Sequence, residues 1–261
     1  MNEVLRQADE IPVTLVTTLA YLTLLVVTQP FGAPEEFAER LASHGWLTGA
    51  AVANGEPWRL LSYAFLHGGI VHVGFNLMML WGLCPALERS LGSLRFAGLY
   101  VVAAAGGGLA TCLCYPPGQP VVGGSGALFG MLGAAIAINM RSGRHLLAFL
   151  DFEGPRRLLG MLVANLVIGF VLPMVSNTAH LGGLLAGFVV TFWWLRPGEA
   201  TRQARLWQLA WSTLFAAACF ASLLPVARSD WLAHAALRAT DPARQDALTR
   251  AALRAHELET R

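Results

Sequence analysis

Charged residues are scarce in this sequence, and lysine is absent. Asp, Glu, Lys and Arg make up 13% of the 261 residues, all 18 cations are arginine, and 55% of the residues are hydrophobic. Soluble domains carry about 25% charged residues. The net charge of +2 and the lack of a basic run with interleaved aromatics exclude a nucleic-acid-binding protein. The composition therefore predicts a membrane protein that is surrounded by a lipid bilayer and has no nucleic-acid partner.

Carboxylates are missing from the middle of every long apolar segment. This absence excludes a paired-aspartate protease and a buried Ser-His-Asp triad, because both need a carboxylate among the embedded residues. The sequence has no His-Glu-x-x-His motif, and His67 and His72 are about 140° apart around a helix, a poor geometry for one metal. We therefore expect no metal and no cofactor. The four cysteines lie in or next to apolar segments and indicate no disulfide framework: Cys84, Cys112, Cys114 and Cys219.

Seven apolar segments are long enough to be membrane spans, since about 20 apolar residues cross the hydrocarbon core. They cover residues 11–28, 60–83, 96–115, 121–140, 158–175, 179–195 and 206–226. The segment 32–58 is too polar to span a membrane and too long for a turn, so we expect it to have structure of its own. The predicted fold class is an all-α polytopic membrane protein.

Most arginines near the ends of these segments lie in alternate connections, and therefore on one side of the membrane. One side holds Arg6, Arg89, Arg95, Arg141, Arg144, Arg156, Arg157, Arg196, Arg202 and Arg205. The loops between segments on the other side hold only Arg40 and Arg59, the latter at the membrane edge. By the positive-inside rule, residues 1–10 are cytoplasmic and residues 115–120 face the opposite side. Arginine without lysine is typical of a GC-rich bacterial genome, so the expected location is a bacterial inner membrane.

The C-terminal tail, residues 228–261, follows the seventh segment and is expected outside the cytoplasm. It has a helix start at Thr240-Asp241-Pro242 and leucines among balanced charges. We interpret it as an amphipathic surface helix, with an interaction module as the alternative.

Polar side chains within the apolar segments are functional candidates, because each is costly in hydrocarbon. These residues are His67, His72, Asn76, Ser125, Asn139, Asn165 and His180. We expect His67 to support the fold, and Asn139 and Asn165 to form hydrogen bonds between helices.

Ser125 and His180 each lie on a helix face that carries glycines. Ser125 shares its face with Phe129 and Gly133, and Gly126 and Gly130 form a small-x-x-x-small pair on the same helix. His180 shares its face with Gly183 and Gly187. Two such faces can approach until the hydroxyl and the imidazole form a hydrogen bond of about 2.6–3.2 Å. These features alone leave a second interpretation open. In it, the glycines serve only to pack the helices, and the polar residues form hydrogen bonds between helices.

His72 and Asn76 are spaced i, i+4, so both side chains project from one helix face and both can donate hydrogen bonds. Such donors, with the Ser125 N–H at the positive end of its helix, would stabilise an oxyanion formed when the serine attacks a carbonyl. Gly123 and Gly124 allow unusual dihedrals and close approach of a substrate. These residues together predict a serine nucleophile.

The residues resemble the motifs of the rhomboid family of intramembrane serine proteases. Gly123-Gly124-Ser125-Gly126 resembles the family's Gly-x-Ser-Gly, Ala179-His180-x-x-Gly183-x-x-x-Gly187 its histidine helix, His72-x-x-x-Asn76 its oxyanion helix, and Trp58-Arg59 the pair in its first loop. The resemblance covers residues 11–195 and implies a six-helix catalytic core with a water-filled cavity open to the outside. Residues 206–226 are then an additional seventh transmembrane helix.

The resemblance implies that Ser125 and His180 form a dyad that cleaves transmembrane segments of other proteins. Phe129 stands where some members have a tyrosine against the histidine, and since a phenyl ring can still stack, we expect activity without that hydroxyl. We expect Trp58 and Arg59 to serve loop structure. Two alternatives stay open: a catalytically silent rhomboid-fold protein that binds membrane helices, and a rhomboid-type enzyme dedicated to a narrow sorting or maturation substrate. The sequence indicates no particular oligomeric state.

Overall fold

The structure is a computed structural model, and it describes residues 10–28, 34–141 and 175–193, with the single residues 167, 245, 246, 249, 250 and 253. Throughout these ranges the regular secondary structure is helical, apart from an isolated antiparallel bridge between Leu47 and Val121. The prediction of an all-α protein is therefore confirmed for the described part of the chain. The spans expected at 158–175 and 206–226 and the tail at 228–261 lie almost wholly outside the described residues.

The long helices follow the apolar segments of the sequence. They are α2 (Pro12–Thr28), α6 (Ile70–Leu91), α7 (Ser93–Cys114), α8 (Ser125–Arg141) and α10 (Asn177–Trp193). Among the described residues, α6 and α7 are long and apolar enough to cross a membrane, while α2, α8 and α10 are apolar helices of 17 residues each.

Short helices occupy the polar segment in which we expected additional structure, and they continue a few residues beyond it. They are α3 (Pro34–Ser43), α4 (Gly49–Ala53), α5 (Arg59–Ser62) and the 3₁₀ turn η1 (Tyr63–Phe65). The expectation that residues 32–58 are structured is thus confirmed for the part from residue 34 onward.

The second apolar segment is not one helix, so the expected span over residues 60–83 is wrong at both ends. The chain forms α5 and η1, turns, and only then enters α6, which begins at Ile70 and continues to Leu91. Gly69 precedes α6 with φ at 122°, a conformation that glycine adopts readily and other residues avoid. A hydropathy window counts apolar residues and does not register this break.

Because α6 extends to Leu91, it contains Glu88, which lies beyond the span we expected. Glu88 is fully buried, and its carboxylate accepts hydrogen bonds from the N–H groups of Val13 (2.8 Å) and Thr14 (2.9 Å) and from the Thr14 hydroxyl (2.7 Å). It therefore caps the start of α2, whose first N–H groups have no partner within the helix. Glu88 is 16 residues from His72 along α6, or about 24 Å, so it is a structural carboxylate remote from that histidine.

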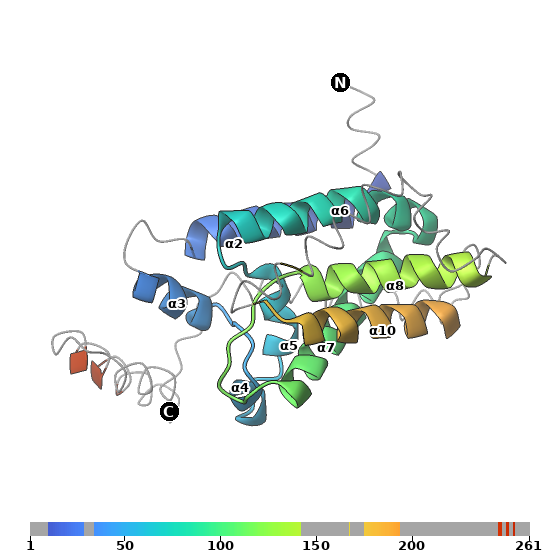
Figure 1. The fold of residues 1–261 in the computed structure, drawn as a ribbon. Helices are drawn as coiled ribbons and strands as arrows, with labels where there is room; N and C mark the ends of the chain where they lie inside the picture. The colour runs from blue at the N-terminus through green and yellow to red at the C-terminus, as the bar shows by residue number, and fades with distance from the viewer. Residues whose placement is uncertain are drawn as a thin grey trace, which may run out of the picture.

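Helices α8 and α10 lie side by side (Figure 1), and glycines bring their backbones into contact. A Cβ at Gly183 would lie 1.9 Å from the carbonyl oxygen of Gly126, and a Cβ at Gly187 would lie 2.0 Å from that of Gly130. No side chain fits in either position. The close helix contact predicted from the glycine spacing is therefore present, and it holds the starts of α8 and α10 together.

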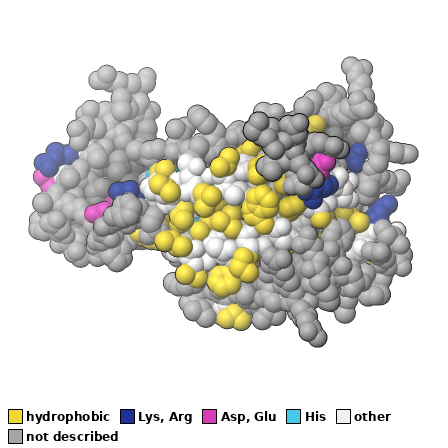
Figure 2. All heavy atoms as spheres, turned by 90° about the horizontal axis from the view of Figure 1, so that it is seen from above, with side chains coloured by type: hydrophobic (Ala, Val, Ile, Leu, Met, Phe, Trp, Pro, Cys, Tyr) yellow, Lys and Arg dark blue, Asp and Glu magenta, His cyan; other side chains and the backbone are white. Residues whose placement is uncertain are grey.

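The outer face of α2 and α6 is apolar. Viewed from this side, Figure 2 shows hydrophobic side chains across the middle of the described surface and charged ones toward its edges. Exposed apolar side chains on these two helices include Leu19, Val26, Val71 and Trp81. A surface of this kind suits contact with lipid chains or with another apolar helix.

Candidate active site

Ser125 and His180 meet where α8 and α10 begin. Ser125 is the first residue of α8 and His180 lies in the first turn of α10, and the Ser125 Oγ is 2.7 Å from the His180 Nε2. Both residues are almost fully buried, with 4% and 2% of their surface exposed. A hydroxyl at hydrogen-bond distance from an imidazole nitrogen is the arrangement of a nucleophile with its general base.

A fixed loop presents the serine to the histidine. Gly123 has φ at 128°, and its N–H donates a hydrogen bond to the Tyr63 carbonyl at 2.9 Å. The Tyr63 hydroxyl in turn donates to the Ala104 carbonyl on α7 at 2.9 Å. The loop before Ser125 is therefore bonded to the backbone of Tyr63, whose side chain is anchored on α7. The positive φ accounts for a glycine at position 123.

The ring of Phe129 covers the histidine. It lies one helical turn after Ser125, and its centroid is 4.3 Å from that of His180 with only 3° between the ring planes. This contact restricts rotation of the imidazole about its side-chain bonds, and it uses only the face of the phenyl ring. A tyrosine hydroxyl is not needed for it.

His72 directs an unpaired nitrogen toward the loop that carries the serine. Its Nδ1 accepts a hydrogen bond from the Gly68 N–H at 3.2 Å, so in the neutral ring the proton sits on Nε2. Within the described structure Nε2 is buried without a hydrogen-bond partner, and a Cβ on Gly123 would lie 2.8 Å from it. His72 thus offers an N–H donor beside the Gly123–Ser125 backbone.

Asn76 lies one turn further along α6 and is fully buried. Its Nδ2 donates to the carbonyl oxygen of His72 at 3.0 Å, while its Oδ1 has no partner among the described residues. An amide NH₂ group has two hydrogens, so one donor is used within α6 and a second is available.

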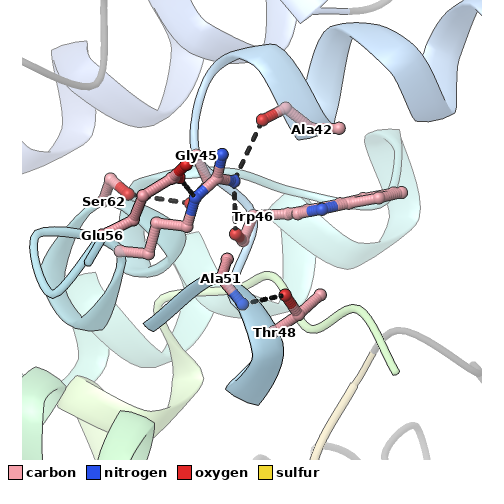
Figure 3. Close-up of polar contacts among 8 residues, drawn as sticks. Ala42, Gly45, Trp46, Thr48, Ala51, Glu56 and Ser62 are labelled. Carbon is pink, nitrogen blue, oxygen red and sulfur yellow. Dashed lines mark hydrogen bonds and ion pairs between the residues drawn. The ribbon is translucent and has the colours of Figure 1, made fainter. Parts of the chain in front are cut away.

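Trp58 and Arg59 lie at the start of α5, and Figure 3 shows the labelled partners of the Arg59 side chain, Ala42, Trp46 and Glu56. The buried guanidinium donates to the carbonyl oxygens of Ala42 (3.1 Å) and Trp46 (2.9 Å) and forms an ion pair with Glu56. It also lies 4.8 Å from the centroid of the Trp58 ring. These contacts connect the end of α3 to α5, a structural role within the loop.

His67 lies behind the site. It is fully buried and neither ring nitrogen has a hydrogen-bond partner in the described structure. Its ring centroid is 4.4 Å from that of Tyr21 on α2 and 5.3 Å from that of His72, both in edge-on geometry. His67 therefore fills the space between α2 and His72, the residue expected to donate to the oxyanion.

Sequence reasoning missed several residues that set the position of His180. The Ser176 Oγ accepts a hydrogen bond from the Ala179 N–H at 3.1 Å and lies 3.2 Å from the Thr111 Oγ1, so it caps α10 and connects that helix to α7. The Asn177 Oδ1 lies 3.1 Å from the His180 Nδ1. A signal for both was present, because serine and asparagine four and three residues before a buried histidine mark a helix start.

Comparisons with known proteins agree on one family. A family model described as the Rhomboid domain matches residues 54–197, more than half of the chain. RHOMBOID-like protein 5 of Arabidopsis thaliana is 41% identical over 153 residues, covering 57% of this chain and 47% of that protein. Rhomboid protease GluP of Bacillus subtilis (strain 168) is 37% identical over 150 residues, covering 58% of this chain and 28% of that protein.

A third relative is rhomboid protease GlpG of Yersinia pseudotuberculosis serotype I (strain IP32953). It is 32% identical over 149 residues, which cover 56% of this chain and 51% of that protein. The chain therefore spans about half or less of the length of these relatives.

Proposed function

This chain belongs to the rhomboid family, and from that premise we propose that it is an intramembrane serine protease that cleaves transmembrane segments of other proteins. The family implies an integral membrane protein. The observation that carries the proposal is the distance of 2.7 Å between the Ser125 Oγ and the His180 Nε2, formed across two helices whose backbones are in contact. A serine and a histidine kept only for packing would not need this alignment.

The proposed reaction is acyl transfer to Ser125. His180 Nε2 takes the hydroxyl proton as Oγ attacks the peptide carbonyl, and the resulting imidazolium gives that proton to the leaving amine. Water, deprotonated by the same nitrogen, then hydrolyses the acyl-enzyme and releases the second product. No metal or cofactor takes part in these steps.

The developing oxyanion requires donors, and the site offers three. The His72 Nε2–H lies beside Gly123, Asn76 has a second amide hydrogen, and the Ser125 N–H is one of the first N–H groups of α8, which have no partner within the helix. Donors arranged before the reaction stabilise charge at little reorganisation cost. We assign this role to His72 and Asn76 together with the serine N–H.

The substrate must expose a peptide bond inside the site, and the backbone of an intact transmembrane helix is fully hydrogen-bonded. We therefore expect small or helix-breaking residues near the cleavage site. We further propose a six-helix catalytic core over residues 11–195, a seventh transmembrane helix at 206–226 and an extracytoplasmic tail at 228–261. In this arrangement the N-terminus is cytoplasmic and the site opens to the other side of a bacterial inner membrane.

The test is the variant Ser125→Ala, purified in detergent and assayed on a panel of fluorogenic transmembrane substrates. We expect cleavage to fall to background while the melting temperature stays within a few degrees of the wild type, because one hydroxyl beside glycines contributes little packing. Ser90→Ala, at the exposed end of α6, is the matched control and should cleave normally. Cleavage by purified Ser125→Ala would end the serine-protease proposal. Binding without cleavage by the wild type would favour a silent helix-binding protein.

A further inference from the structure

We propose that Asn177 is a positioning residue for His180, which it holds in the tautomer that leaves Nε2 free to accept the Ser125 proton. The inference rests on the proposed function and extends it. It adds to the serine–histidine pair a third residue, an uncharged amide that accepts a hydrogen bond from the imidazole. It explains how the imidazole can be oriented in a site where none of the described residues places a carboxylate against the histidine.

The contact between Asn177 and His180 lies within the first turn of α10. Asn177 is the first residue of α10 and precedes His180 by three residues, so both side chains lie on one face of the first turn. The Asn177 Oδ1 is 3.1 Å from the His180 Nδ1. The Ser176 cap holds this turn against α7 through Thr111, which limits movement of the asparagine backbone.

The tautomer follows from the two contacts of the ring. A neutral imidazole has one N–H and one lone pair, and an amide oxygen at Nδ1 requires the N–H at that nitrogen. The lone pair is then on Nε2, 2.7 Å from the Ser125 Oγ, as a general base requires. The opposite tautomer would present an N–H to the serine and could not accept its proton.

The same contact persists during the reaction. When Nε2 takes the serine proton, the imidazolium has N–H groups on both nitrogens, and the one on Nδ1 still donates to Asn177. The amide dipole therefore stabilises the charged form without adding a charge of its own. Asn177 is half-buried, so this stabilisation is only partly screened by water.

Among the described residues, few titratable groups surround His180. In the described structure, the titratable side chain of His72 on α6 lies near the site, with its Nε2 beside Gly123. The α8 helix faces His180 with the uncharged Ser125 and Phe129. The α7 helix approaches through Gly107, where a Cβ would lie 2.7 Å from the Ala179 carbonyl oxygen. Of the described groups, His180 and His72 are therefore the ones on which a pH profile of the site reports.

The experiment measures the rate at which a fluorophosphonate probe labels Ser125 in the full-length protein, as a function of pH. The variants are Asn177→Ala, Asn177→Asp and the neighbouring control Thr178→Ala. The Thr178 Oγ1 lies 2.7 Å from the Ser176 Oγ, and it takes no part in the hydrogen bonds that join Ser125, His180 and Asn177. We expect Asn177→Ala to label about 10- to 100-fold more slowly, since part of the general-base contribution is lost. Thr178→Ala should stay within about threefold of the wild type, because it disturbs the same turn without touching the imidazole.

Asn177→Asp separates positioning from packing. An aspartate accepts from Nδ1 in any orientation, so it should restore labelling at high pH to within about threefold of the wild type. Its negative charge favours the imidazolium, which is inactive as a base, so the acid limb of the profile should move up by about one pH unit. A packing role would produce neither the recovery nor this shift.

The outcomes are distinguishable. Labelling of Asn177→Ala with the wild-type rate and profile would overturn the role of Asn177 and leave the protease proposal intact. An Asn177→Asp protein as slow as Asn177→Ala at every pH, but equally stable, would also overturn it. If the wild type itself is not labelled at Ser125, the proposed function fails first.

Discussion

At the scale of single residues, one short contact decides what each histidine of the site can do. The Gly68 N–H donates to Nδ1 of His72, which leaves a proton on its Nε2, whereas the Asn177 oxygen at Nδ1 of His180 leaves a lone pair on its Nε2. Two imidazoles in one buried site thus take opposite roles, one as donor and one as acceptor. Each assignment depends on a partner within four residues along the chain.

The donor role of His72 and Asn76 can be measured by substitution. His72→Ala and Asn76→Ala should each lower the cleavage rate by about 10²- to 10³-fold, the usual effect of one oxyanion donor. The double variant should cost less than the product of the two, because residues that stabilise one oxyanion act as a unit. Rates on one fluorogenic transmembrane substrate, with melting temperatures as control, test this. Wild-type rates for both single variants at unchanged stability would show that His72 and Asn76 do not stabilise the oxyanion, and that α6 has a structural role alone.

At the scale of helices, the distance between Ser125 and His180 is set by backbone contact. The carbonyl oxygens of Gly126 and Gly130 occupy the space where side chains at Gly183 and Gly187 would lie. Any added volume must move α10 away from α8, and with it the imidazole. The packing of these helices therefore sets the distance between Ser125 and His180.

Gly187→Ala should expose this coupling. Its Cβ would lie 2.0 Å from the Gly130 carbonyl oxygen, so we expect a loss of about 1–3 kcal/mol of stability together with a large loss of activity. Gly74→Ala on α6 is the control, because no described atom lies within 4 Å of its Cβ, and alanine there should stabilise the helix by up to about 1 kcal/mol. Unfolding in detergent followed by tryptophan fluorescence gives both values. Equal stability of the two variants would contradict the proposed coupling.

At the scale of the whole molecule, the site lies at one end of the helix bundle. Helices α8 and α10 begin at the same end (Figure 1), with Ser125 first in α8 and His180 in the first turn of α10. In α6, His72 lies in the first turn, and Glu88 near the other end bonds to the start of α2. If the arginine distribution sets the orientation, the site opens away from the cytoplasm. The loop containing Gly118 and the turn after Ser90 then lie on opposite sides of the membrane.

Cysteine labelling in intact cells tests the orientation. With the four native cysteines replaced, Gly118→Cys should react with a membrane-impermeant thiol reagent, and Ser90→Cys should react only after the cells are opened. Both positions are exposed, so differences in burial do not confuse the comparison. The reverse pattern would invert the proposed topology.

Composition and periodicity were enough to predict the helical class, the positions of α2, α7, α8 and α10 to within about four residues, and the glycine contact between α8 and α10. These are local properties, because apolar length defines a membrane helix and glycine spacing defines a face that allows close approach. The glycine faces and the family motifs together predicted the pairing of Ser125 with His180, whose Oγ and Nε2 the structure places 2.7 Å apart. The catalytic roles of these residues stay predictions.

Only the tertiary structure decided where α6 begins and ends, why Glu88 is buried, and with which groups Tyr63 and Arg59 form hydrogen bonds. Glu88 pairs with residues 74 and 75 positions away, and Tyr63 with a carbonyl 41 positions away. No local pattern encodes such partners, because they depend on which helix ends the packing brings together. The contact of Asn177 with His180 is the intermediate case: its three-residue spacing is local, but only the orientation of the imidazole toward Ser125 gives it a chemical meaning.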